Sequence, residues 1–391
     1  MSTSRVPLAP VDPDLVSPSS AAAAPPRAAR VLHVVNGEHY SGAERVQDLL
    51  AGYLPACGYA VGFACVKPDR FPRVRKFAEA PLYELPMRNR LDRSCGRRVA
   101  QLVRDEQYDL VHAHSPRSLV VASQAAELAG VPLVYHVHSP AGRDSTRRLV
   151  NRINAWTERR CAKIAARLIA VSPSVQQYMI DQGFPAERVV CVPNGVPRIE
   201  VPPRTQTPRT WTLGMVALFR PRKGVETLLD ALAVARSTGV DATLRAVGPF
   251  ETPQYEAQTK ARVQRLGLEE AVLWTGFAAE IAGELARVDA LALPSLFGEG
   301  LPMVVLEAMA AGVPVIASHV EGIPLAIRHG QDGLLVEPGS VSQLAAAIEE
   351  LAAGRYDYPR LSESAQRRHA ECFSAEVMAR RTAAVYDEIL G

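Results

Sequence analysis

Short apolar runs rich in β-branched residues alternate along this chain with longer stretches in which apolar residues recur every three or four positions. The short runs are typical of buried strands and the longer stretches of amphipathic helices, such as 44–53 and 225–236. This alternation predicts an α/β fold with parallel sheets. The strand candidates form two series: 30–35, 60–66, 109–113, 132–137, 168–171 and 189–192, and then 212–217, 242–247, 271–275, 290–293, 313–317 and 333–336.

A proline-rich stretch at 201–209 separates the two series and is typical of a linker. The pattern therefore predicts two doubly wound, Rossmann-like domains that face each other across a cleft. Ligands of such sheets bind at the carboxyl ends of the strands, which is where candidate site residues are expected.

The composition is that of an ordinary globular protein, with 48% hydrophobic and 22% charged residues in a length of 391, which suggests two or three domains. No stretch approaches the ~20 apolar residues that a membrane span needs. Residues 1–29 are rich in Pro, Ala and Ser without the apolar core of a signal peptide, and we expect a disordered tail.

The cysteines are scattered and form no Cys-x-x-Cys pair. This favours a reducing cytoplasm and predicts no structural zinc. The six positions are Cys57, Cys65, Cys95, Cys161, Cys191 and Cys372.

The net charge of +3 is unevenly distributed, because residues 30–200 hold 24 Lys and Arg against 16 Asp and Glu. Basic clusters at 67–76, 88–98 and 143–167 suggest an anionic partner, although each cluster alone is typical of a solvated surface. A phosphorylated acceptor and an anionic membrane face both fit this charge. A nucleic acid is disfavoured because no recognised binding motif accompanies it.

Two glutamates, Glu299 and Glu307, lie in the otherwise uncharged stretch 298–310. A carboxylate among apolar residues is costly unless it meets hydrogen-bond donors, and sugar and ribose hydroxyls are such donors. Pro302 suits a first helical turn and Gly312 a helix C-terminus. At ~1.5 Å per residue the two carboxylates are about 12 Å apart, comparable to a sugar and a ribose across a diphosphate. A structural helix with a capping glutamate fits the same spacing.

The start of this predicted helix offers backbone N–H groups to an anion. Pro302 has no N–H, so the expected donors are Gly300, Leu301, Met303 and Val304.

Two turns that follow predicted strands are candidates for contact with a phosphate. Gly42 lies in the turn 40–46, where a glycine lets the backbone approach a ligand ahead of a helix N-terminus. The second turn, 218–224, carries Arg220, Arg222 and Lys223, whose charges could neutralise a diphosphate leaving group. An ordinary glycine turn and a basic surface turn are the alternatives.

Two His-x-His pairs end predicted strands: His112 with His114, and His136 with His138. A spacing of two places both rings of a pair on one face of the strand. Metal ligands, structural histidines and a substrate-contacting histidine are three interpretations. No carboxylate pattern supports the metal.

The segment 298–310 resembles the glutamate-pair motif of glycosyltransferase family 4, whose members are retaining, nucleotide-sugar-dependent enzymes with the two-domain GT-B fold. Its flanks agree as well, at Pro294-Ser295 and at 311–315. The resemblance extends over residues 30–391. It implies that Glu299 contacts the donor sugar and that Glu307 holds the ribose.

Other matches follow the same family. The turn at Gly42 resembles the N-terminal glycine loop, with Ser41 in place of its first glycine, and His138 aligns with a histidine that touches the donor sugar. Lys223 matches directly, whereas the expected arginine position holds Leu218, so that Arg220 or Arg222 must substitute. The motifs 247–249 and 274–277 resemble turns near the donor base and add Gly248 and Phe277.

A further segment departs from the family pattern. In 320–325, Glu321 replaces a usual glycine and Leu325 a usual glutamate, and we expect these changes to matter less than changes at the glutamate pair.

The resemblance implies an organisation with a tail at 1–29, an acceptor-binding domain at 30–200, a linker at 201–210 and a nucleotide-sugar-binding domain at 211–372. A helix at 373–391 would return to the first domain.

The resemblance also implies a retaining glycosyltransferase that needs no metal and no cofactor beyond its nucleotide-sugar co-substrate. The basic first half suggests a glycan or lipid-linked acceptor in cell-envelope or exopolysaccharide assembly, with the enzyme in the cytoplasm or peripheral at the inner face of the membrane. A nucleotide-sugar epimerase of the same architecture, or a non-catalytic nucleotide-sugar-binding scaffold, is the alternative.

Overall fold

The computed structural model describes residues 28–89, 92–139, 156–278 and 280–391. Within these residues the first half forms one sheet in the order β3–β2–β1–β4–β5–β6–β7, and all neighbouring strands are parallel. Its strands are β1 (Ala29–Val35), β2 (Tyr59–Cys65), β3 (Leu82–Glu84), β4 (Leu110–Ala113), β5 (Leu133–Val137), β6 (Arg167–Ala170) and β7 (Val189–Cys191).

The second half forms a separate parallel sheet in the order β10–β9–β8–β11–β12–β13. Its strands are β8 (Trp211–Val216), β9 (Ala242–Val247), β10 (Val272–Gly276), β11 (Ala290–Leu293), β12 (Val315–Ser318) and β13 (Gly333–Val336). The strand order reverses between β1 and β4 in the first sheet and between β8 and β11 in the second. Such reversal points open a crevice at the carboxyl ends of the strands.

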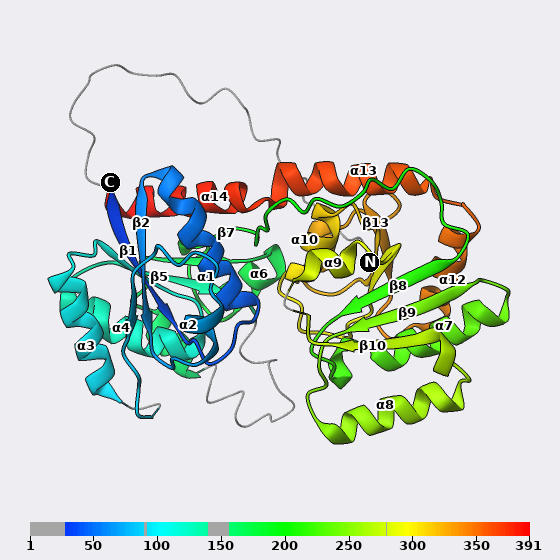
Figure 1. Cartoon of the computed structure of the whole chain (residues 1–391). Coiled ribbons are helices and arrows are strands. Elements are labelled where there is room, and N and C mark those ends of the chain that lie inside the picture. The colour runs from blue at the N-terminus through cyan, green and yellow to red at the C-terminus, as the bar shows by residue number, and fades with distance from the viewer. Residues whose placement is uncertain (1–27, 90–91, 140–155, 279) are drawn as a thin grey trace, which may run out of the picture.

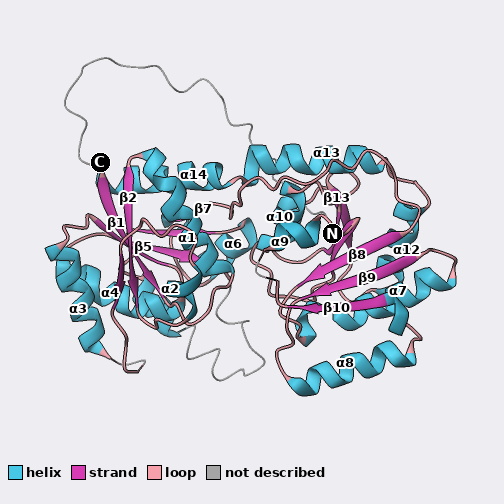
Figure 2. Cartoon of the chain, viewed as in Figure 1, coloured by secondary structure: helices cyan, strands magenta, loops and turns pink. Residues whose placement is uncertain are grey.

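Helices flank both sheets, as Figure 2 shows. The first half holds α1 (Gly42–Tyr53), α2 (Arg70–Val74), α3 (Arg93–Asp105), α4 (Pro116–Ala129) and α6 (Pro173–Asp181). The second half holds α7 (Val225–Ser237), α8 (Pro253–Arg265), α9 (Ile281–Leu285), α10 (Met303–Ala310), α11 (Ile323–Ala326), α12 (Val341–Ala352) and α13 (Tyr358–Arg368). The last helix, α14 (Ala375–Leu390), ends the chain.

The predicted α/β class with two doubly wound parallel sheets is confirmed. Every predicted strand overlaps an observed one, and the amphipathic stretches form α1 and α7. The sequence pattern missed β3, whose three residues lie at the sheet edge and are only partly buried, so they show no clear alternation. Of the tail predicted at 1–29, residues 1–27 lie outside the described residues, and Ala29 already belongs to β1. Residues 143–155 of the basic cluster at 143–167 also lie outside the described residues.

The end of the chain crosses from the second half to the first between α13 and α14. In Figure 1, α13 runs along the second half and α14 along the first, beside β2 and α1. A five-residue π-helical stretch, His369–Phe373, joins the two helices. The Tyr386 hydroxyl lies 2.6 Å from Nδ1 of His112, so α14 reaches the interior of the first half. The domain boundaries inferred from the sequence stay a prediction.

One hydrophobic core joins the two halves. The buried cluster around Val34 in β1 continues through Leu306 in α10 to Tyr386 in α14. The second sheet has another cluster of its own, around Leu213 and Leu244. The shared core fixes α10 against the first half, and α10 carries Glu307. Within the described part of the chain, no helix is both long enough and apolar enough to span a bilayer.

A buried carboxylate ties α13 to the second sheet. Asp332 is fully buried and accepts hydrogen bonds from Nε and Nη2 of Arg328, at 2.6 and 2.7 Å, and from Oγ of Ser364 at 2.8 Å. Arg368 of α13 adds an ion pair at 3.5 Å. Burial opposes ionisation, but the bonds from Arg328 and Ser364 outweigh it and lower the pKa of Asp332.

We expect Asp332→Ala to lower the free energy of unfolding by about 2–3 kcal/mol, less than for a fully buried pair because Arg328 is partly exposed. Because the native pKa lies below the unfolded value, the carboxylate stabilises the fold above about pH 4, and this stabilisation is lost as the pH falls. Urea unfolding at pH 7 and at lower pH measures both effects. Glu363→Ala, at an exposed position of α13, is the control. Equal stability of the two variants at pH 7 would contradict the prediction.

Candidate active site

Four loops meet where the two sheets reverse their strand order. The loops after β1 and β4 come from the first half, and the loops after β8 and β11 come from the second. The first loop leads to Gly42 at the start of α1, and the second begins with His114, two residues after His112 of β4. The third loop carries Lys223 and the fourth carries Glu299. The topology therefore brings together residues that are up to 257 positions apart in the sequence, from Gly42 to Glu299.

Glu299 is buried in the loop after β11 and is held by a cation and a hydroxyl. Its Oε1 forms an ion pair with Nζ of Lys223 and accepts a hydrogen bond from Oγ of Ser295 at 2.7 Å. Burial lowers the pKa of Lys223, and the charge of Glu299 only partly offsets this. The structure thus joins two residues that the sequence selected independently.

Gly224 explains how Lys223 reaches this position. It adopts φ +69°, and a Cβ there would lie 2.0 Å from the Pro294 carbonyl oxygen. Only a glycine lets the loop after β8 pass this close to the loop after β11. Lys223 is therefore placed beside Glu299 by the backbone as well as by charge.

The two arginines of the basic loop have different surroundings. Nη1 of Arg222 donates to the carbonyl oxygens of Phe297 and Gly298, at 3.1 and 3.0 Å, and lies 3.8 Å from Glu299. Nη1 of Arg220 lies 3.6 Å from Oε1 of Glu251. Arg222 thus holds the loop that carries Glu299 by hydrogen bonds to its backbone. The partner of Arg220 is the more exposed carboxylate of Glu251, at a longer distance.

Glu307 is buried on α10 and forms an ion pair with Nη2 of Arg45 from α1. Burial opposes the charge on Arg45, but Glu307 outweighs it and raises the pKa of Arg45. This ion pair crosses between the two halves of the molecule. The sequence analysis missed Arg45 as a site residue, although it belongs to the glycine turn at 40–46 that drew attention to Gly42.

The start of α10 lies against the first half. A Cβ on Gly42 would lie 3.7 Å from Cγ of Met303, and one on Gly300 only 1.9 Å from the His138 carbonyl oxygen. The Leu301 carbonyl accepts a hydrogen bond from Nδ2 of Asn194 at 2.9 Å. Because α10 begins at Met303, the N–H groups of Met303 and Val304 have no acceptor within the helix. The predicted amide donors thus lie at the junction of the two halves.

Glu321 contacts the glutamate-pair loop directly. Its carboxylate accepts hydrogen bonds from the backbone N–H groups of Gly298 and Glu299, at 3.0 and 3.2 Å. Its φ of +35° is rare for a residue with a side chain. Substitution of the usual glycine therefore places an additional carboxylate beside Glu299, a contact that the sequence did not reveal.

Gly248 and Phe277 lie at the same edge of the second sheet, farther from Glu299. Gly248 has φ +132°, and a Cβ there would lie 1.9 Å from the Ala217 carbonyl oxygen, so the turn after β9 needs a glycine. Phe277 follows β10 and is 71% exposed. The strand order places β8 and β9 between this aromatic ring and β11.

The histidines lie together in the interior of the first half. Nδ1 of His114 is 3.2 Å from Nε2 of His138, and Nε2 of His114 is 3.1 Å from Nδ1 of His33. Burial lowers the pKa of His33 and His138 to about 3, and it lowers the pKa of His114 as well. These rings are therefore neutral at physiological pH.

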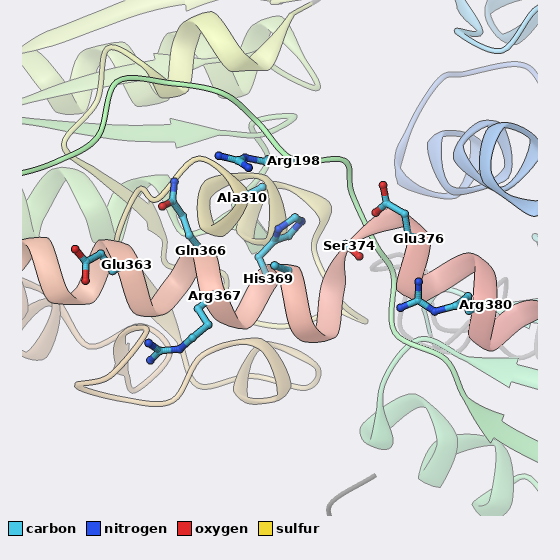
Figure 3. Close-up of a pocket in the computed structure, with 10 residues that line it drawn as sticks. Arg198, Ala310, Glu363, Gln366, Arg367, His369, Ser374, Glu376 and Arg380 are labelled. Carbon is cyan, nitrogen blue, oxygen red and sulfur yellow. The ribbon is translucent and has the colours of Figure 1, made fainter. Parts of the chain in front are cut away.

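A hollow of about 610 Å³ lies elsewhere, at the crossover between α13 and α14. Figure 3 shows Arg198, Arg367, His369 and Arg380 at its edge. None of the sequence-selected site residues lines it.

Two Rossmann-like sheets with their reversal points at a common junction define the GT-B class of glycosyltransferases. A family model described as "Glycosyltransferase Family 4" matches residues 40–198, and one described as "Glycosyl transferases group 1" matches residues 210–353. The chain belongs to glycosyltransferase family 4, and it is a glycosyltransferase that uses nucleotide-sugar donors.

Characterised relatives and solved structures agree with this assignment. The chain is 29% identical over 309 residues to the MMP alpha-(1->4)-mannosyltransferase of Mycolicibacterium hassiacum, covering 75% of this chain and 74% of the relative. It is 27% identical to the Escherichia coli UDP-Gal:alpha-D-GlcNAc-diphosphoundecaprenol alpha-1,3-galactosyltransferase, covering 63% and 67%. The structure of Anabaena Alr3699/HepE in complex with UDP-glucose superimposes with a TM-score of 0.80 at 25% identity, covering 92% of this chain and 99% of that one.

Proposed function

We propose that this protein is a retaining glycosyltransferase that moves a sugar from a nucleotide-diphosphate sugar to a glycan or lipid-linked acceptor, in cell-envelope or exopolysaccharide biosynthesis. The observation that carries the proposal is the pair of buried carboxylates, Glu299 and Glu307, on either side of the start of α10. Relatives include a galactosyltransferase whose printed acceptor is a diphosphoundecaprenol-linked sugar, a phosphatidyl-myo-inositol mannosyltransferase and an exopolysaccharide phosphotransferase.

In this proposal each carboxylate leaves its ion pair with a protein cation and accepts hydrogen bonds from substrate hydroxyls instead. Glu299 turns from Lys223 to the donor sugar, and Glu307 turns from Arg45 to the ribose. Lys223 and Arg45 are then free to face the diphosphate between them. The amides of Gly300, Leu301, Met303 and Val304 face the same anion, where a helix N-terminus favours negative charge.

Lys223 and Arg220 stabilise the leaving diphosphate as the glycosidic bond breaks. Such charge stabilisation is strongest in a buried site from which water is excluded, and the Lys223 side chain is only 14% exposed. His138 contacts the donor sugar, the turn at Gly42 approaches the diphosphate, and Gly248 and Phe277 lie near the base. The leaving phosphate takes the acceptor proton on the front face of the sugar, so that the sugar keeps its anomeric configuration.

Replacing Glu307 tests the ribose contact. We expect Glu307→Ala to weaken binding of the free nucleoside diphosphate, because ribose hydroxyls lose a charged acceptor worth about 1.5–3 kcal/mol. This corresponds to roughly a 10- to 150-fold rise in Kd. Calorimetry with UDP, GDP and ADP measures it, with Glu349→Ala on α12 as the control. An unchanged affinity in a folded variant would remove Glu307 from the donor site.

Replacing the cations of the basic loop tests the leaving-group role. Lys223→Ala should lower kcat/KM by about 100- to 1000-fold, the usual effect of removing one charge-stabilising group. Arg220→Ala should behave similarly, because its guanidinium is less occupied than that of Arg222. Steady-state kinetics on the three single variants decides the order. A larger loss for Arg222→Ala than for Arg220→Ala would give the role to Arg222.

Turnover should need no divalent ion at the diphosphate, since Lys223, Arg220 and the α10 amides supply the charge. We expect equal rates of transfer in EDTA and in excess Mg²⁺ or Mn²⁺. A rate that is lost in EDTA and recovered with Mg²⁺ or Mn²⁺ would refute this part of the proposal.

The basic first half holds the enzyme peripherally at an anionic membrane, with about 1 kcal/mol from each Lys or Arg near the surface. Arg75 donates a hydrogen bond to a backbone carbonyl oxygen, and Lys76 donates one to Glu280, so replacing either would also remove a contact within the protein. The exposed arginines of α2 and α3 are therefore the residues to test. Neutralising Arg70, Arg73, Arg93 and Arg97 should reduce co-sedimentation with anionic liposomes, and raised salt should reduce it further. Neutral liposomes are the control. A wild-type protein that does not co-sediment with anionic liposomes at low salt would contradict membrane contact.

A further inference from the structure

Five histidine rings lie on one face of the first sheet. His33 on β1 and His112 on β4 are paired in register, and parallel partners in register point to the same side. His114, His136 and His138 follow at spacings of two on β4 and β5 or directly after them, which keeps them on that face. The sequence analysis identified four of these residues and missed His33, which is 81 positions from His114 and farther still from His136 and His138.

Two groups of three rings bring their nitrogens close together. One nitrogen from each of His114, His136 and His138 lies within 4.8 Å of the other two, and the same holds for His33, His112 and His114. In the second group, Nδ1 of His112 is already hydrogen-bonded to the Tyr386 hydroxyl, at 2.6 Å. His114 belongs to both groups. Each of its two ring nitrogens can bind at most one ion.

His136 distinguishes the two groups. It is fully buried, and neither of its ring nitrogens has a hydrogen-bond partner in the described part of the chain. A buried polar group without a partner is costly, on the order of 1–3 kcal/mol, and every neutral imidazole has one lone pair to offer. A bound cation would satisfy that lone pair.

We propose that His114, His136 and His138 bind one divalent transition-metal ion of the Zn²⁺ class. Zinc–nitrogen distances of about 2.0–2.1 Å in a tetrahedron place ligand nitrogens roughly 3.3 Å apart. Nδ1 of His114 and Nε2 of His138 are 3.2 Å apart, which agrees with two such ligands. The other nitrogen of His114 faces His33 at 3.1 Å, the outer-shell contact that orients a metal-bound imidazole.

The ligand chemistry selects the kind of metal. Neutral imidazoles suit Zn²⁺, Ni²⁺, Co²⁺ and Cu²⁺, whereas Mg²⁺ and Ca²⁺ need carboxylate or carbonyl oxygens. Both groups of ligands found among the described residues consist of histidine alone. The site departs from the expectation of no structural zinc, which rested on the spacing of the cysteines.

The ion joins the carboxyl ends of β4 and β5 and fixes the segment that meets the second half. His138 supplies one ligand, and its carbonyl oxygen packs against Gly300 at the start of the glutamate-pair loop. The ion is thus held close to this loop and is distinct from an ion on the diphosphate. Of the three proposed ligands, only His138 also belongs to the donor site proposed above.

The test is metal binding by the full-length protein after stripping with a strong chelator. Equilibrium dialysis against Zn²⁺, followed by elemental analysis, should give one ion per chain, and Co²⁺ should give the visible spectrum of a tetrahedral site. His136→Leu should reduce bound Zn²⁺ at least tenfold. His112→Leu, which alters only the other group, and His329→Ala, at an exposed position of the second half, should bind as the wild type does.

Circular dichroism establishes that each variant is folded, and His136→Gln replaces His136→Leu if the latter fails to fold. Failure of the wild type to retain Zn²⁺ would overturn the proposal and leave a network of hydrogen-bonded neutral rings. Unchanged binding by a folded His136 variant would overturn it too, as would loss of binding in His112→Leu alone.

Discussion

The burial of two carboxylates beside one helix start constrains the rest of this structure. Glu299 and Glu307 lie among apolar residues, where an unpaired charge costs several kcal/mol. Each is paired with a cation from a distant segment, Lys223 after β8 and Arg45 on α1. The loops after β1, β8 and β11 must therefore converge, and the parallel sheets with reversed strand order make this possible.

The Arg45–Glu307 ion pair also fixes how the two halves meet. It crosses the junction beside two other contacts, the Asn194–Leu301 hydrogen bond and the approach of Gly300 to the His138 carbonyl oxygen. Small residues at Gly42 and Gly300 permit this closeness. Under the proposed function, substrate hydroxyls compete with Arg45 and Lys223, so donor binding and the contact between the two halves are coupled.

The sequence predicted the fold and the candidate site to different extents. The strands were predictable because buried parallel strands are continuous apolar runs, and β3 was not because it is short and lies at an edge. Glu299, Glu307 and Lys223 could be selected as candidate site residues because a charge in an apolar or glycine-flanked segment is conspicuous locally, and their roles stay predictions. The pairing of Lys223 with Glu299 required the topology of the second sheet.

The contacts that sequence reasoning missed are long-range ones. Arg45 and Glu307 are 262 positions apart, and no local pattern reveals that α1 packs against α10. His33 is an isolated histidine in a strand and becomes part of a cluster only when β1 pairs with β4. Glu321 was noticed as a departure from the family pattern, but its bonds to Gly298 and Glu299 follow from a loop conformation with positive φ.

The central claim is that the donor binds between the two buried ion pairs, at the start of α10. Hydrogen–deuterium exchange with saturating UDP-, GDP- or ADP-sugar locates that binding directly. The account predicts that one of these donors slows exchange at 298–307 and at 220–224, with little change around α13. Protection confined to the hollow at the crossover of α13 and α14, or none with any of the three donors, would contradict it.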